Sequence, residues 1–442
     1  MTSQSKLLHK TIGMPQAIAL YISAVLGSGI LLVPGLAAEV AGPASLAAWG
    51  LMIVLILPMA LSMGLLSAKY PNAGGVSHYV TLAFGERAGA LIGWFFLMSV
   101  PIGAPVAALT GAGYLTAALG LGERARITIA AITIVVALLI NWIGMKLAGR
   151  IQVAVVLSIT AVLLFTFIAA IPYMSVEHLT PFAPHGWTSV GQAGALLFWC
   201  FIGWEAVSHL SEEFKDPQRA AIRGVTIAAL LVGVLYFMTA LATVATNSYI
   251  IAGSDASLIW IISQPLGIYG AVLTGATGLF ICMATIIAYV GASSRVAYAL
   301  ARQGAAPGWM GKLSSKYLTP IGALGFLSLC FILVMFLYGS GLVSLTTLIQ
   351  LPNASFILTY LGGCAAGVRL LKGNRFGQWI SGISFVATAV VFPFTGWAML
   401  YPGVVLLVFV LIRWLRGRKS IIVEEKGAQT RASVAEQRNG RQ

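Results

Sequence analysis

The chain has 442 residues, of which 59% are hydrophobic and 9% are charged, and its formal net charge is +14. Soluble domains carry about 25% charged residues, so this composition excludes a soluble globular protein and predicts a polytopic membrane protein forming one bundle. The basic residues are spread through short polar segments, so they indicate membrane topology and not nucleic-acid binding. The four cysteines lie in apolar runs without metal-ligand spacing, so we expect no disulfide, metal site or cofactor.

A membrane-spanning helix needs roughly 20 mostly apolar residues, and the chain contains about twelve such runs. In chain order these predicted spans are 12–38, 44–67, 88–118, 126–145, 150–172, 190–210, 220–246, 268–300, 318–338, 343–368, 377–395 and 398–414. The longest outward loop is 173–189, and the polar tail 416–442 has the composition of a disordered segment.

The distribution of basic residues tests this count of spans. An even number of spans places both termini on one side of the membrane. The outward loops then contain only Arg124 and Arg126, and all other Lys and Arg residues fall on the side of the termini. Because basic residues concentrate in cytoplasmic loops, the sequence predicts that both termini are cytoplasmic.

Three small residues, Gly27, Ser28 and Gly29, lie near the middle of the first span. Unwound backbone is tolerated at membrane depth only where it lines a cavity or is buried in protein. The triplet is therefore typical of a broken helix that binds a transported substrate. Small residues also allow two helices to pack closely, and the spacing alone leaves both interpretations open.

A similar pattern occurs at the start of the sixth span. Gly27 follows Gln16 by eleven positions, and Gly203 follows Gln192 by eleven positions. The two spans begin five spans apart, so the second would enter the membrane from the opposite side. The pattern is that of an inverted repeat with two broken helices that meet near the midplane.

Two broken helices of opposite direction suit a zwitterion. Helix N-terminal amides carry partial positive charge and bind a carboxylate, while helix C-terminal carbonyls bind an ammonium group. The glycines at both breaks allow close backbone approach, and Ser28 could add a hydroxyl group. This arrangement predicts recognition of an amino acid largely by backbone groups.

Glu205 is the most distinctive side chain, because it lies just after the second break in an otherwise apolar segment. An ionisable group within a span is a functional candidate, and this one could take up and release protons during transport. The structural alternative is that it pairs with a cation or caps the amides of the broken helix. Among the neighbouring aromatic residues, Phe201 and Trp204 are candidates for a pocket or gate, with core packing as their alternative role.

Four segments in order resemble the amino acid/polyamine/organocation (APC) transporter superfamily. They are Gly27-Ser28-Gly29-Ile30 with Pro34, Tyr70-Pro71-Asn72-Ala73-Gly74-Gly75, Phe198-Trp199-Cys200-Phe201-Ile202-Gly203-Trp204-Glu205-Ala206 and Ser211-Glu212-Glu213-Phe214-Lys215-Asp216-Pro217. Further segments are similar to the bacterial exporters of L-methionine and branched-chain amino acids. These are Gly74-Gly75-Val76-Ser77-His78, Gly93-Trp94-Phe95, Val100-Pro101-Ile102-Gly103, Phe198-Trp199-Cys200-Phe201 and His209-Leu210-Ser211-Glu212-Glu213-Phe214-Lys215.

The resemblance implies an all-α fold with a five-plus-five inverted repeat, broken helices one and six, and two further helices. It implies a cytoplasmic N-terminus at 1–11, a first repeat at 12–172, a second repeat at 190–368 and two helices at 369–415. The implied substrate contacts are Gly27, Ser28, Gly29, Ile30, Phe201, Ile202, Gly203 and Trp204, with Glu205 as the proton-coupling or gating residue.

The expected function is proton-coupled efflux, by alternating access, of neutral apolar amino acids such as L-methionine, leucine, isoleucine and valine. No second acid is visible near the breaks to balance a cationic side chain, which favours a neutral substrate. The alternative is an uptake or exchange carrier of the same fold for amino acids or polyamines. The sequence lacks the motifs that are characteristic of a channel, of a membrane enzyme and of ATP-driven transport. We expect a monomer or homodimer in the bacterial inner membrane.

Overall fold

The structure is a computed structural model that describes residues 13–72, 74–143, 148–205, 215–254 and 256–414. Within these ranges all regular secondary structure is helical. The expected N-terminal segment 1–11, the tail 416–442 and residues 206–214, which include most of the charged segment after span six, lie outside the described residues.

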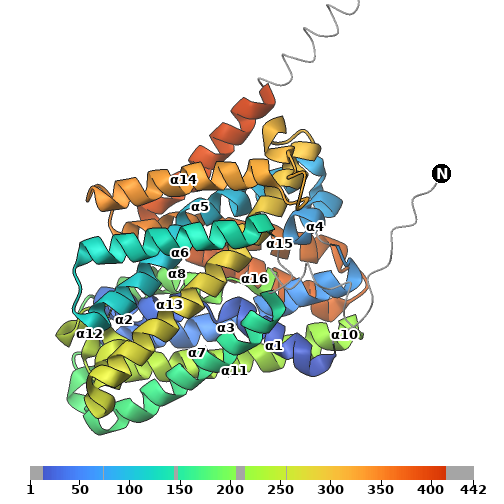
Figure 1. Cartoon of the computed structure of the whole chain (residues 1–442). Coiled ribbons are helices and arrows are strands. Elements are labelled where there is room, and N and C mark those ends of the chain that lie inside the picture. The colour runs from blue at the N-terminus through green and yellow to red at the C-terminus, as the bar shows by residue number, and fades with distance from the viewer. Residues whose placement is uncertain (1–12, 73, 144–147, 206–214, 255, 415–442) are drawn as a thin grey trace, which may run out of the picture.

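In Figure 1 the long helices run roughly side by side between the end that carries α12 and the end that carries α1 and α10. The longer helices are α1 (Met14–Val25), α2 (Gly29–Ala41), α3 (Ser45–Lys69), α4 (Gly75–Phe84), α5 (Glu86–Leu119), α6 (Glu123–Ile143), α7 (Ala148–Ala170), α8 (Thr188–Leu197), α11 (Val225–Ala245), α13 (Ser257–Arg302), α14 (Ile321–Gly339), α15 (Leu345–Leu370), α16 (Arg375–Val391) and a helix at 400–414. The short elements are η1 (Gly42–Ala44), η2 (Ile171–Tyr173), η3 (Val176–Leu179), η4 (Phe198–Phe201), α10 (Pro217–Arg219), η6 (Ala220–Gly224), α12 (Ser248–Ile251), η7 (Gly308–Gly311) and η8 (Phe392–Met399).

By length and composition, the described residues contain 9 helical stretches that could cross a membrane. Three of them are longer than one crossing needs, because Gly29–Lys69 has 41 residues, Ser257–Arg302 has 46 and Arg375–Trp414 has 40. Each contains a glycine with a positive φ angle at which the helix is interrupted: Gly42 (61°), Gly267 (56°) and Gly396 (58°). The count of twelve spans therefore remains a prediction.

Helix α5 forms the centre of the bundle. It packs most extensively against α13, and also against α15, α4 and α6. Most of its residues are buried, and it contains Pro101 and Pro105. A proline lacks the amide hydrogen that a helix interior uses, so the pair weakens the helix where it passes the two breaks.

The outer surface of the bundle carries large apolar side chains. Examples are Val54 of α3, Ile132 of α6, Phe336 of α14 and Leu407 of the last helix, which are all more than half exposed. Water would penalise such a surface, and lipid would not. The fold is thus built for a bilayer environment.

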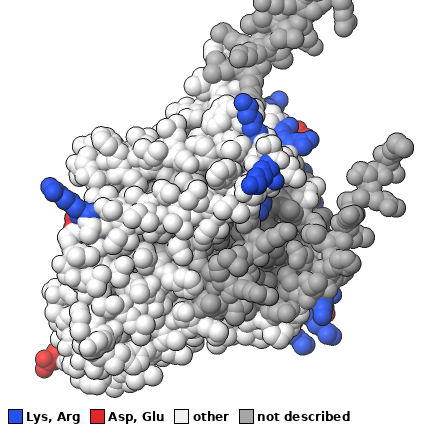
Figure 2. All heavy atoms as spheres, in the orientation of Figure 1, with Lys and Arg blue, Asp and Glu red and all other residues white. Residues whose placement is uncertain are grey.

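Lysines and arginines gather at one end of the molecule. Figure 2 shows most of them at the end that carries α10 in Figure 1, with a smaller group at the opposite end. At the basic end, Nζ of Lys69 donates to the carbonyl oxygen of Leu370 at 2.8 Å, and the Tyr70 hydroxyl donates to the same oxygen at 3.2 Å. Lys69 therefore holds the negative C-terminal end of α15.

Candidate functional site

The two expected breaks are present and lie against each other. α1 ends at Val25 and α2 begins at Gly29. The other helix changes from α8 to the 3-10 turn η4, which is followed by extended backbone at Ile202 (φ −76°, ψ 144°). Gly203 then adopts φ +130°, and a Cβ atom at this position would overlap the carbonyl group of Ala24. Only glycine allows this backbone-to-backbone contact.

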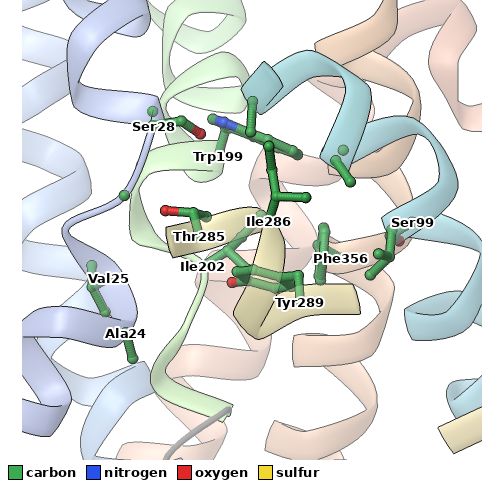
Figure 3. Close-up of a pocket in the computed structure, with 16 residues that line it drawn as sticks. Ala24, Val25, Ser28, Ser99, Trp199, Ile202, Thr285, Ile286, Tyr289 and Phe356 are labelled. Atoms are coloured by element: carbon green, nitrogen blue, oxygen red, sulfur yellow. The ribbon is translucent and has the colours of Figure 1, made fainter. Parts of the chain in front are cut away.

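Beside the breaks lies a cavity that is formed by α1, α2, α5, η4, α13 and α15 and the backbone between them (Figure 3). Its lining residues are Ala24, Val25, Gly27, Ser28, Gly29, Ser99, Val100, Gly103, Ala104, Ala107, Trp199, Ile202, Thr285, Ile286, Tyr289 and Phe356. None of these lining residues carries a charge. The cavity leaves about 50 Å³ for the centres of water-sized molecules. One buried water needs about 10–15 Å³ by that measure, so the cavity has room for a few waters in this conformation.

The start of α2 supplies the polar edge of the cavity. The first amides of a helix have no partner within the helix, and they carry its positive dipole end. Ser28 occupies the N-cap position, yet its side chain makes no capping hydrogen bond. In Figure 3 its hydroxyl group points towards the neighbouring Trp199 side chain. Gly27, Ser28 and Gly29 therefore present amides and one hydroxyl group to an anionic group.

Trp199 forms one wall of the cavity and rests on two glycines. A Cβ atom placed on Gly29 would lie 2.9 Å from Cδ1 of Trp199, and one placed on Gly103 would lie 2.9 Å from its Cη2. The indole thus extends from α2 to α5. Its ring also contacts Phe356 edge-on, with 6.4 Å between ring centres. Glycine at both ends leaves room for this large side chain.

At the second break the protein satisfies the free amide itself. The Gly203 amide donates to Oε2 of Glu205 at 2.9 Å and also lies 3.2 Å from the Tyr360 hydroxyl oxygen. The Tyr360 hydroxyl donates to the same carboxylate oxygen. Glu205 is 2% exposed and does not line the cavity. Its described contacts are those of the capping role that the sequence left open as the structural alternative.

The end of α8 is also held by a side chain. Nδ2 of Asn353 in α15 donates to the carbonyl oxygen of Ala195 at 2.6 Å. This carbonyl lies where α8 tightens into η4, so its helical partner is displaced. Helix α15 therefore supports the second break on both sides, through Asn353 before it and Tyr360 after it.

The expected substrate contacts separate into two groups. Gly27, Ser28, Gly29 and Ile202 line the cavity. The other expected contacts do not line it: Ile30, Phe201, Gly203 and Trp204.

These four residues lie in the bundle core or between the breaks. Phe201 is fully buried, with its ring centre 5.9 Å from that of Trp49. The Trp204 ring lies 6.2 Å from that of Tyr21. Phe201 and Trp204, which were expected to form a pocket or gate, therefore do not contact the cavity directly in this conformation.

Several lining residues were not expected from the sequence. Ser99 and Gly103 come from α5, Thr285 and Tyr289 from α13, and Phe356 from α15. The proline pair in α5 was a usable signal, since a helix kinks next to something that it must accommodate. The residues of α13 and α15 carry no such signal, because an aromatic residue in an apolar span most often indicates packing.

Comparisons with known proteins cover almost the whole described region. A model of the amino acid permease family matches residues 12–414. An uncharacterized amino acid permease of Bacillus subtilis, YecA, is 39% identical over 90% of this chain and 94% of its own length. The L-methionine/branched-chain amino acid exporter YjeH of Escherichia coli is 29% identical over 90% and 95%. The branched-chain amino acid permease BcaP of Bacillus subtilis is 29% identical over 74% of each chain.

Proposed function

Because the chain belongs to the amino acid permease family of the APC superfamily, we propose that it exports neutral, apolar amino acids by proton-coupled alternating access. The family membership confirms the expected polytopic all-α membrane protein, and it confirms a transporter and not an enzyme. L-Methionine, leucine, isoleucine and valine are the proposed substrates.

The observation that carries this proposal is the chemistry of the cavity. One edge is the start of α2, where amides and the Ser28 hydroxyl group are available for a carboxylate. The remaining walls are formed by apolar and aromatic side chains, chiefly Trp199, Tyr289 and Phe356. A cationic side chain would enter a wall that lacks a charged partner, which is costly. An amino acid with a neutral side chain suits both parts of the cavity, because its carboxylate meets the start of α2 and its side chain meets the apolar walls.

The proposed direction and coupling rest on separate observations. Export is supported by the similarity to the Escherichia coli exporter. Proton coupling is supported by Glu205, an acid that is buried beside the second break and accepts a hydrogen bond from the Gly203 amide. The basic end in Figure 2 supports cytoplasmic termini in a bacterial inner membrane. We propose a monomer or homodimer as the functional unit.

Transport from preloaded vesicles tests this function. Purified protein is reconstituted, and vesicles are loaded with labelled methionine, leucine or arginine. We expect efflux of methionine and leucine that accelerates several-fold when the outside is acidic, with protein-free vesicles as the control. Efflux of arginine but not methionine would contradict the proposed substrate class. Efflux that requires external amino acid would favour exchange, which is the alternative function.

A further inference from the structure

Tyr236 lies in α11 and contacts both breaks through one atom. Its hydroxyl oxygen is 2.9 Å from the carbonyl oxygen of Val25 and 3.0 Å from that of Cys200. Val25 is the last residue of α1, and Cys200 lies in η4 directly before the second break. Both carbonyls would bond to an amide four residues later if the helices continued. The breaks remove those partners, and a single side chain replaces them.

The surroundings of Tyr236 fix the position of this hydroxyl group. The residue is fully buried. Its ring packs edge-on against Trp49 at 5.6 Å and against Phe201 at 5.2 Å between ring centres. Edge-on aromatic contacts at such distances are favourable and orient the ring. The hydroxyl group therefore cannot turn away from the two carbonyls without disturbing the core.

We propose that Tyr236 is a positioning residue that holds the two broken helices in register on α11, so that the cavity edge is formed before substrate arrives. One hydroxyl group is shared by an acceptor on each break, so it links the two breaks to each other. The start of α2 and the backbone at Ile202 then keep a fixed spacing. This inference rests on the proposed function, because it assigns Tyr236 a role in substrate affinity.

The test is Tyr236→Phe, which removes the hydroxyl oxygen and keeps the ring. The matched control is Tyr401→Phe, because the Tyr401 hydroxyl group also donates to a backbone carbonyl, that of Met98 at 2.6 Å, away from both breaks. We expect Tyr236→Phe to raise the KM for methionine efflux about three- to ten-fold with a smaller change in maximal rate. This range corresponds to the loss of one shared hydrogen bond. Tyr401→Phe is expected to leave the KM within about two-fold.

Hydrogen exchange of the substrate-free protein provides a readout that is independent of transport. In nanodiscs, Tyr236→Phe should accelerate amide exchange in both segments 26–31 and 199–205, whereas Tyr401→Phe should accelerate neither. Faster exchange in only one segment, or an unchanged KM with unchanged exchange, would overturn the proposal. A wild-type protein that moves no amino acid would instead contradict the proposed function, and the exchange result would still decide the role of Tyr236.

Discussion

The two breaks differ in how their backbone groups are satisfied. At the second break, the Gly203 amide is bonded to the Glu205 carboxylate and lies beside the Tyr360 hydroxyl group. At the first break, the Ser28 side chain makes no capping bond, and the start of α2 lines the cavity. The first break thus offers donors to a ligand, whereas the second keeps an internal acceptor. From this difference we propose that the substrate carboxylate binds at the start of α2.

Removing the contact between the breaks should have the largest effect. Gly203→Ala introduces a Cβ atom that overlaps the Ala24 carbonyl group, at a φ of +130° that other residues rarely adopt. We expect methionine efflux to fall by about 100-fold or more, since several kcal/mol of strain must be relieved by separating the breaks.

The control for this change is Gly194→Ala, because a Cβ atom on Gly194 of α8 meets no other atom within 4 Å. Efflux is measured per amount of monodisperse protein, so that loss of folding is counted separately. Wild-type efflux by Gly203→Ala would show that the two backbones need not touch during transport.

Replacing the internal acceptor sharpens the comparison next. Glu205→Gln retains an oxygen that can accept from the Gly203 amide, but it cannot exchange a proton. We expect a pH gradient no longer to accelerate efflux, so that the rate of gradient-driven efflux falls by about ten-fold at most. Exchange of labelled for unlabelled methionine should continue. The measurement is efflux and exchange in the same vesicles. Gradient-driven efflux at the wild-type rate would leave Glu205 with the capping role alone.

The smallest of the three effects is expected opposite the first break. Gly103→Ala places a Cβ atom 2.9 Å from Cη2 of Trp199, which pushes the indole into the cavity. Affinity for methionine and leucine should fall about five- to ten-fold, and affinity for alanine should fall less, because a methylene-sized change in a pocket is worth roughly 1 kcal/mol at the lower end of its range. Competition of unlabelled amino acids against labelled methionine measures this. Equal losses for all three substrates would argue against Trp199 as a wall of the side-chain pocket.

The sequence was sufficient for the class of fold and for the positions of the breaks. Gly27, Ser28, Gly29 and Gly203 could be identified because glycine in an apolar span is costly unless the backbone bends or approaches another chain segment. The composition likewise predicted a bilayer protein. These inferences depend on which residue types are present at a position or in a segment, and not on contacts between distant segments.

The walls of the site could not be derived in this way. Thr285, Tyr289 and Phe356 reach the cavity from helices far away in the sequence, and only the packing of α13 and α15 against α5 brings them there. The partners of Glu205 were hidden for the same reason, since Tyr360 follows it by 155 positions. Phe201 lies in the 3-10 turn η4 and Trp204 follows the extended backbone at Ile202, so neither side chain has the direction that a continuous α-helix would give it.

The internal bond at Gly203 has a consequence for the unloaded carrier. A strict exchanger returns to its starting orientation only with a bound substrate, whereas a net exporter must also reorient without one. An amide left bare in an apolar bundle would penalise this return step by several kcal/mol. Here the amide is bonded to Glu205 and lies beside Tyr360, so it needs no substrate as a partner. The proposed one-way export, which requires this return step, is therefore not opposed at this position.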